Sequence, residues 1–115
     1  MATEFDYGQL EAITGGDVEF EVEILQEYLA SVPREVEKLS AAIAAGDSKT
    51  TGSVAHALKG ASATIGAKGL AATALVIEQA GKKGDTALAT GALAGLVSEF
   101  EEVLALLRER IARAA

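Results

Sequence analysis

The feature that most constrains the fold is a helical repeat of apolar residues that is interrupted by glycine turns. Apolar side chains recur at the three-to-four residue spacing that gathers them on one side of an α-helix. The interruptions fall at Gly46-Asp47, Gly66-Ala67 and Gly84-Asp85, and each is short. Because short connections make successive helices antiparallel neighbours, we expect an all-α protein. The expected architecture is an antiparallel, up-down-up-down four-helix bundle over about residues 17–113.

A shorter helical segment, over about residues 5–14, precedes this bundle. Its expected docking residues are Phe5, Leu10 and Ile13. We find no linker, low-complexity tract or second hydrophobic pattern, so residues 1–115 are expected to form a single domain.

The first long helix is expected to begin after Asp17, whose side chain is a good N-cap. Its periodicity predicts that Phe20 and Tyr28 are buried and that the glutamates, Glu21 among them, face solvent. Pro33 interrupts the pattern and leaves two alternatives. It either begins a new helix, where the first turn tolerates proline, or lies within one long, bent helix.

Composition excludes several classes of function. The chain has no cysteine and one histidine, so disulfides, thiolate zinc sites and multi-histidine metal sites are ruled out, although carboxylate sites remain open. We expect no metal or cofactor on this chain. A net charge of −7 argues against nucleic-acid binding. The chain has neither an apolar run of membrane-spanning length nor a signal-peptide pattern, so we expect no membrane insertion and a cytoplasmic protein. We also expect the protein to be a monomer.

The distribution of charge is more informative than its sum. No Asp or Glu occurs between Ser48 and Ile77, whereas Lys49, Lys59 and Lys68 do. A locally negative partner would be attracted to this region and repelled elsewhere.

The single histidine, His56, lies in this region and faces away from the apolar side of its predicted helix. On a helical wheel, Val54, Leu58 and Ile65 fall on one side. The opposite side carries Lys49, Ser53, His56, Lys59, Gly60 and Ala63. Ser62 falls near the core edge, and we interpret it as structural.

The neighbours of His56 suit covalent capture of a phosphoryl group. A neutral imidazole is a competent nucleophile near pH 7 without a separate activating base. Gly60 lies one turn further along, where a glycine costs helix stability but lets another protein approach closely. Lys59 brings an ammonium within reach of an anion on the ring, and phosphoryl transfer depends mainly on alignment and charge stabilisation.

These residues resemble a known family. The run His56-Ala57-Leu58-Lys59-Gly60-Ala61-Ser62, followed by Ile65-Gly66-Ala67, is similar to the His-x-Leu-Lys-Gly-x-Ser signature of histidine-containing phosphotransfer (HPt) domains. The similarity covers nearly the whole chain, including the turns at Gly46-Asp47 and Gly84-Asp85.

The resemblance implies a four-helix bundle in which His56 is phosphorylated on its outer ring nitrogen. It implies that Lys59 is the charge partner of the phosphate and that Gly60 provides clearance for a partner. We expect the partner-binding surface to include Lys49, Ser53, Ala63 and Lys68. The implied partners are a response-regulator receiver domain, a hybrid sensor histidine kinase or both, with magnesium bound only on the receiver.

We expect a phosphoryl carrier rather than an enzyme. The segment from Gly60 to Gly66 lacks the Lys-Ser/Thr of a phosphate loop and follows a helix, so no ATP site is expected. Two alternatives stay open. One is the phosphoacceptor domain of a chemotaxis-type sensor kinase, phosphorylated by an ATP-bound catalytic domain. The other is a structural bundle that binds a receiver or another helix without carrying a phosphoryl group.

Overall fold

The computed structural model describes residues 4–114, and within this range every regular element is a helix. The helices are α1 (Tyr7–Thr14), α2 (Val18–Ala44), α3 (Ser48–Ile65), α4 (Lys68–Lys83) and α5 (Thr86–Ala114). The expectation of an all-α protein is therefore confirmed. No helix in the described part of the chain is long and apolar enough to cross a membrane.

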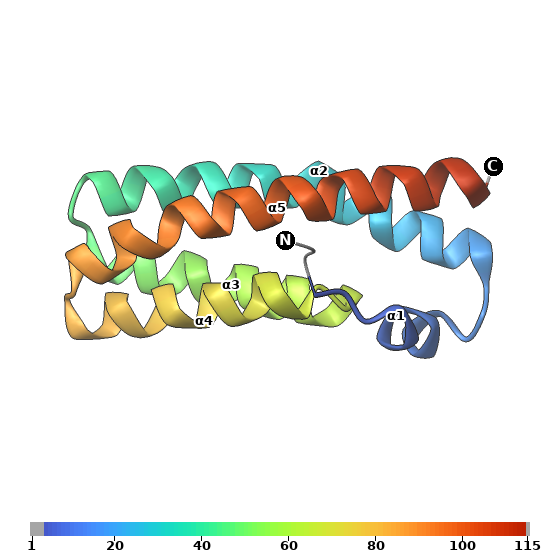
Figure 1. The fold of residues 1–115 in the computed structure, drawn as a ribbon, viewed down its shortest axis with the longest axis horizontal. Coiled ribbons are helices and arrows are strands. Elements are labelled where there is room, and N and C mark those ends of the chain that lie inside the picture. Colours follow the sequence, from blue (N-terminus) through green and yellow to red (C-terminus); the bar gives the residue numbers. More distant parts are fainter. Residues whose placement is uncertain (1–3, 115) are drawn as a thin grey trace.

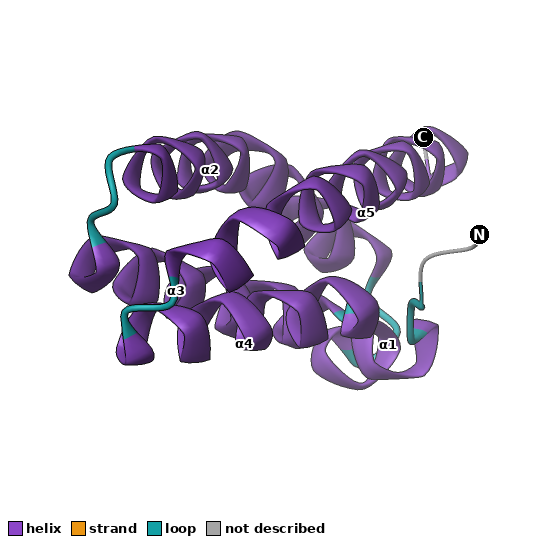
Figure 2. Ribbon diagram, turned by 60° about the vertical axis from the view of Figure 1, so that its left-hand side comes forward, coloured by secondary structure: helices purple, strands orange, loops and turns teal. Residues whose placement is uncertain are grey.

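The four longer helices lie side by side along the 43 Å long axis of the molecule (Figure 1). α2 and α5 form one layer and α3 and α4 form the other, while α1 lies near the start of α2 (Figures 1 and 2). Helix α3 packs against α2 and α4, and α5 packs against α2 and α4. Leucines dominate the interior because they fill the space between helices in low-energy rotamers. The fully buried leucines are Leu10, Leu25, Leu39, Leu58, Leu70, Leu96 and Leu107.

The helix boundaries follow from the side chains at the ends. The Asp47 carboxylate accepts a hydrogen bond from the Thr50 N–H at 3.0 Å and so caps α3. Gly66 ends α3 with a φ of 96°, a left-handed conformation that favours glycine. Asp6 caps α1 through the Gln9 N–H, so this helix begins at Tyr7, two residues later than the expected start at position 5.

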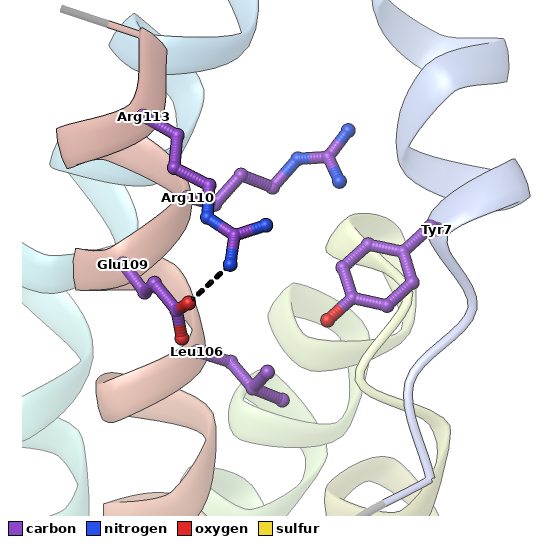
Figure 3. Close-up of a pocket in the computed structure, with 5 residues that line it drawn as sticks. All are labelled: Tyr7, Leu106, Glu109, Arg110 and Arg113. Carbon is purple, nitrogen blue, oxygen red and sulfur yellow. Dashed lines mark hydrogen bonds and ion pairs between the residues drawn. The ribbon is translucent and has the colours of Figure 1, made fainter.

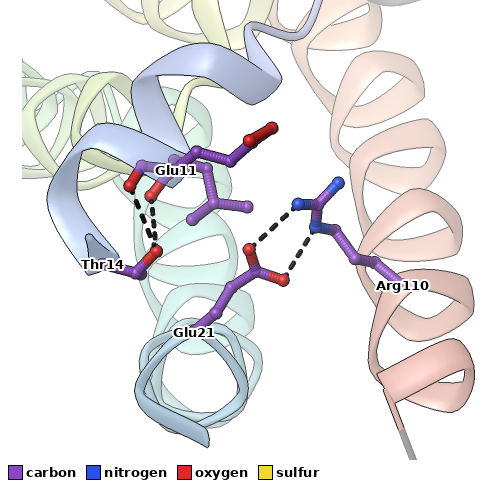
Figure 4. A network of polar contacts seen from close by, with 5 residues as sticks. Glu11, Thr14, Glu21 and Arg110 are labelled. Atoms are coloured by element: carbon purple, nitrogen blue, oxygen red, sulfur yellow. Dashed lines mark hydrogen bonds and ion pairs between the residues drawn. The ribbon is translucent and has the colours of Figure 1, made fainter. Parts of the chain in front are cut away.

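Two expectations about α2 were wrong. Phe20 is 43% exposed, whereas Glu21 is buried. The reason is Arg110 of α5, whose guanidinium donates two hydrogen bonds to the Glu21 carboxylate, at 2.8 and 2.9 Å (Figure 4). Sequence periodicity within α2 cannot reveal a partner on a helix that is distant along the chain. Pro33 lies inside α2, so of the two alternatives the structure has one long helix.

Arg110 also connects α1 to the longer helices. Its guanidinium carbon lies 5.0 Å from the centre of the Tyr7 ring, a cation–π contact. A hollow of about 420 Å³ beside this contact is lined by residues of α1 and α5 (Figure 3). The lining residues are Tyr7, Leu106, Glu109, Arg110 and Arg113. This cluster docks α1 and is built from different helices than those around His56.

Ser62 is completely buried, which confirms its structural interpretation. Its hydroxyl shares a hydrogen bond with the hydroxyl of Tyr28 at 2.9 Å, which joins α3 to α2 inside the core. A buried hydroxyl without such a partner would lower the free energy of unfolding, because the group loses its hydrogen bonds to water on folding.

A pair of glycines lets α3 and α4 approach closely. A Cβ added to Gly81 would lie 2.7 Å from the Gly52 N and 2.9 Å from the Ser48 O, both backbone atoms that cannot move aside. The two helix backbones therefore meet at Gly52 and Gly81. This contact sets the spacing of the helix pair that carries His56.

Gly81→Ala is expected to lower the free energy of unfolding by about 1–3 kcal/mol, because the added methyl forces the two backbones apart. Gly91→Ala is the matched control, since Gly91 is an exposed position of α5 and a Cβ added there meets no atom within 4 Å. The control should instead gain up to about 1 kcal/mol from reduced backbone entropy of the unfolded chain. Urea denaturation measures both changes, and equal effects of the two variants would contradict the close packing at Gly81.

Candidate functional site

His56 lies in the middle of α3, with 67% of its side chain exposed. Val54, Leu58 and Ile65 of the same helix are buried, so the opposite face is fixed in the core. The predicted outward orientation of the imidazole is confirmed.

The imidazole is held by a carboxylate from the neighbouring helix. The His56 Nδ1 lies 2.9 Å from the Oε2 of Glu78 on α4. The Glu78 side chain is only 4% exposed. An exposed nucleophile is therefore oriented by a nearly buried anion.

Two lysines neutralise this anion. The Lys59 Nζ lies 2.7 Å from Glu78 Oε1, and the Lys82 Nζ lies 3.3 Å from Glu78 Oε2. The pKa of Glu78 is lowered to about 2, chiefly by Lys59 and further by His56 and Lys82, against the opposing effect of burial. Glu78 is consequently ionised at neutral pH.

An ionised carboxylate can only accept hydrogen bonds, so the Nδ1 of His56 must be the donor. In a neutral ring the single proton then resides on Nδ1, and Nε2 keeps its lone pair. Glu78 thus selects the tautomer in which the second ring nitrogen is the nucleophile.

The surface around His56 is open on the side of Gly60. A Cβ added to Gly60 would meet no atom within 4 Å, and Ala63, one turn further along, is also exposed. On the other side, a hollow of about 390 Å³ adjoins the imidazole, and Lys49, Ser53 and Lys82 contribute to its lining. Lys49 and Ser53 therefore share the face of His56, as the sequence predicted.

Lys68 has a different setting. It is the first residue of α4, at the other end of the α3–α4 pair from the Gly52–Gly81 contact. Its ammonium lies 3.0 Å from the Asp6 carboxylate. The Asp6 N–H also donates to the Gly66 carbonyl at 2.7 Å, so the segment before α1 is fixed to this turn. The structure does not bring Lys68 into the cluster around Glu78.

Sequence reasoning missed Glu78 and Lys82. The acid-free interval around His56 exists along the chain but not in space, because Glu78 comes from the adjacent helix. The signal was available in the short turn at Gly66-Ala67. In an antiparallel helix pair, residues at similar sequence distances from the turn become neighbours, as His56 and Glu78 do.

Among residues 4–114, no group of three or more His, Cys, Asp or Glu side chains is arranged to hold a metal ion.

The buried carboxylate gives the fold an acid-sensitive component. Because the pKa of Glu78 in the folded protein is below its ordinary value of 4.5, its stabilising contribution is complete above pH 4.5 and disappears as the pH falls toward 2. Glu78→Gln should therefore lose less stability than the unmodified protein between pH 4.5 and 2. Urea denaturation at a series of pH values measures this slope. The control is Glu101→Gln, an exposed position whose variant should keep the original slope, and equal slopes for all three proteins would contradict the role of Glu78.

Comparisons with known proteins bear on the family and on the fold. The family model described as Hpt domain matches residues 23–114. The structure is similar to that of histidine-containing phosphotransfer protein B (HptB) from Pseudomonas aeruginosa PAO1, with 24% sequence identity, a TM-score of 0.91 and 98% of each chain covered. No curated protein gives a significant match. At this identity the structural likeness shows the fold, whereas the family model covers most of the chain. The chain therefore belongs to the family of Hpt domains, which carry out histidine phosphotransfer in phosphorelays.

Proposed function

We propose that His56 is the residue that carries the phosphoryl group, on Nε2, and that it exchanges this group with the aspartate of a response-regulator receiver domain. The observation that supports this assignment is the Nδ1 contact with the ionised Glu78, since it leaves Nε2 as an exposed nucleophile. His56 is also the single histidine of the chain.

The proposed transfer balances without a further co-reactant. The Nε2 lone pair forms the N–P bond, and the O–P bond to the partner's aspartate breaks, returning its electron pair to that carboxylate. The ring then bears a positive charge that is shared with the Nδ1–H. Glu78 stabilises this charge from 2.9 Å, and Lys59 and Lys82 place positive charge beside the incoming phosphoryl group.

We further propose that the partner docks over the exposed face of α3, on an antiparallel four-helix bundle that holds this face rigid. Gly60 provides the clearance, and Lys49, Ser53 and Ala63 lie on the same face. Lys68 is proposed for the edge of this contact, in a transient interface of modest size.

Magnesium is assigned to the receiver, and the chain is proposed to act as a monomeric, cytoplasmic carrier without an ATP site. The partner is a receiver domain that is free-standing or part of a hybrid sensor histidine kinase. The family match does not favour the phosphoacceptor domain of a chemotaxis-type kinase.

His56→Gln should abolish labelling, because the variant has no imidazole. The chain is incubated with a panel of phosphorylated receivers, and acid-labile label on it is scored. Circular dichroism checks that the variant keeps its helices. Acid-labile label on His56→Gln, or none on the unmodified chain with any receiver, would contradict the proposal.

Gly60→Leu should weaken receiver binding by tenfold or more, because the side chain projects into the space that the partner needs. The control is Gly91→Leu, which adds the same side chain to an exposed glycine on α5. Titration with a receiver identified in the labelling experiment measures both affinities. Unchanged affinity of a folded Gly60→Leu protein would show that the partner docks elsewhere.

A further inference from the structure

We propose that Lys82, rather than Lys59, is the cation that makes direct contact with the phosphoryl group on His56, while Lys59 stays paired with Glu78. This inference rests on the proposed phosphorylation of His56. Of the two lysines that contact the Glu78 carboxylate, Lys59 then stays in place and Lys82 moves to the phosphoryl group.

Lys59 is held in place by the oxygen that it neutralises. Glu78 Oε1 is buried from solvent and has no partner with hydrogen-bond geometry among the described residues, so the Lys59 ammonium, 2.7 Å away, compensates it as an ion pair. The Lys59 side chain is itself only 30% exposed. If Lys59 moved to the phosphoryl group, a buried, charged oxygen would lose its partner, which is among the most costly changes in a protein interior.

Lys82 can leave at much lower cost. Its ammonium lies at the longer distance of 3.3 Å from Glu78 Oε2, and its side chain is 70% exposed. The same Oε2 accepts the hydrogen bond from His56 Nδ1 at 2.9 Å, so it stays satisfied after Lys82 departs. Because the Lys82 ammonium is itself exposed to water, its departure leaves no buried polar atom without a partner.

Lys82 is also placed to reach the phosphoryl group. It lies one helical turn after Glu78 on α4 and lines the same hollow as His56. A phosphoryl group brings close to two negative charges and several acceptor oxygens, which attract a flexible ammonium more strongly than an oxygen that is already shared. Its position in the last turn of α4 does not by itself reveal this role, because a lysine there also suits the helix dipole.

The test uses the whole chain, loaded with potassium phosphoramidate, which transfers its phosphoryl group to an imidazole and releases ammonia. A ³¹P NMR titration then gives the pKa of the phosphoryl group in the unmodified protein, in Lys82→Gln and in Lys83→Gln. Lys83 is the matched control, since it is an exposed lysine in the same turn that lies outside the cluster around Glu78. Loss of a contacting cation should raise this pKa by about half a unit or more in Lys82→Gln alone.

A second measurement separates the two lysines. ¹H–¹⁵N spectra of the lysine ammonium groups are recorded before and after loading, with assignments from Lys59→Arg and Lys82→Arg. The Lys82 signal should shift and its exchange with water should slow, while the Lys59 signal stays near its original position.

The outcomes are distinct. If neither phosphoramidate nor any phosphorylated receiver loads His56, the proposed function fails, and this inference fails with it. If His56 is loaded but Lys82→Gln titrates like Lys83→Gln, or the Lys59 signal shifts while that of Lys82 does not, only the assignment of Lys82 is overturned.

Discussion

The arrangement around His56 depends on one nearly buried carboxylate, that of Glu78. An anion in that position is tolerated because Lys59, Lys82 and the imidazole N–H surround it. These groups meet because α3 and α4 are close enough for their backbones to touch at Gly52 and Gly81. Helix spacing, carboxylate ionisation and imidazole tautomer are therefore linked, and a change in the first alters the other two.

Two glutamates of the described chain, Glu21 and Glu78, are buried, and their partners give them different roles. Glu21 is matched by the two-pronged hydrogen bond of Arg110, a closed pair that joins α2 to α5 and supports the docking of α1 (Figure 4). Glu78 instead faces one half-buried partner, Lys59, and two exposed ones, His56 and Lys82. Only the second arrangement leaves reactive atoms in contact with solvent, which distinguishes a structural ion pair from a site that can exchange a group with another protein.

Much of this could be predicted from the sequence, because the controlling features are local. Helical periodicity placed His56 opposite Val54 and Leu58, and the glycine turns defined the helix ends. The missed features all involve partners on other helices: Arg110 for Glu21, and Glu78 for His56. Periodicity within one helix reports which side is buried, but it does not report which side chain of a neighbouring helix lies opposite.

The central claim is that Glu78 keeps the proton on Nδ1 and leaves Nε2 free to accept the phosphoryl group. Long-range ¹H–¹⁵N correlation of the His56 ring in its neutral form tests this directly. We predict a protonated Nδ1 and an unprotonated Nε2 before phosphorylation, and ³¹P coupling to Nε2 afterwards. A neutral ring with its proton on Nε2, or a phosphoryl group on Nδ1, would contradict the account.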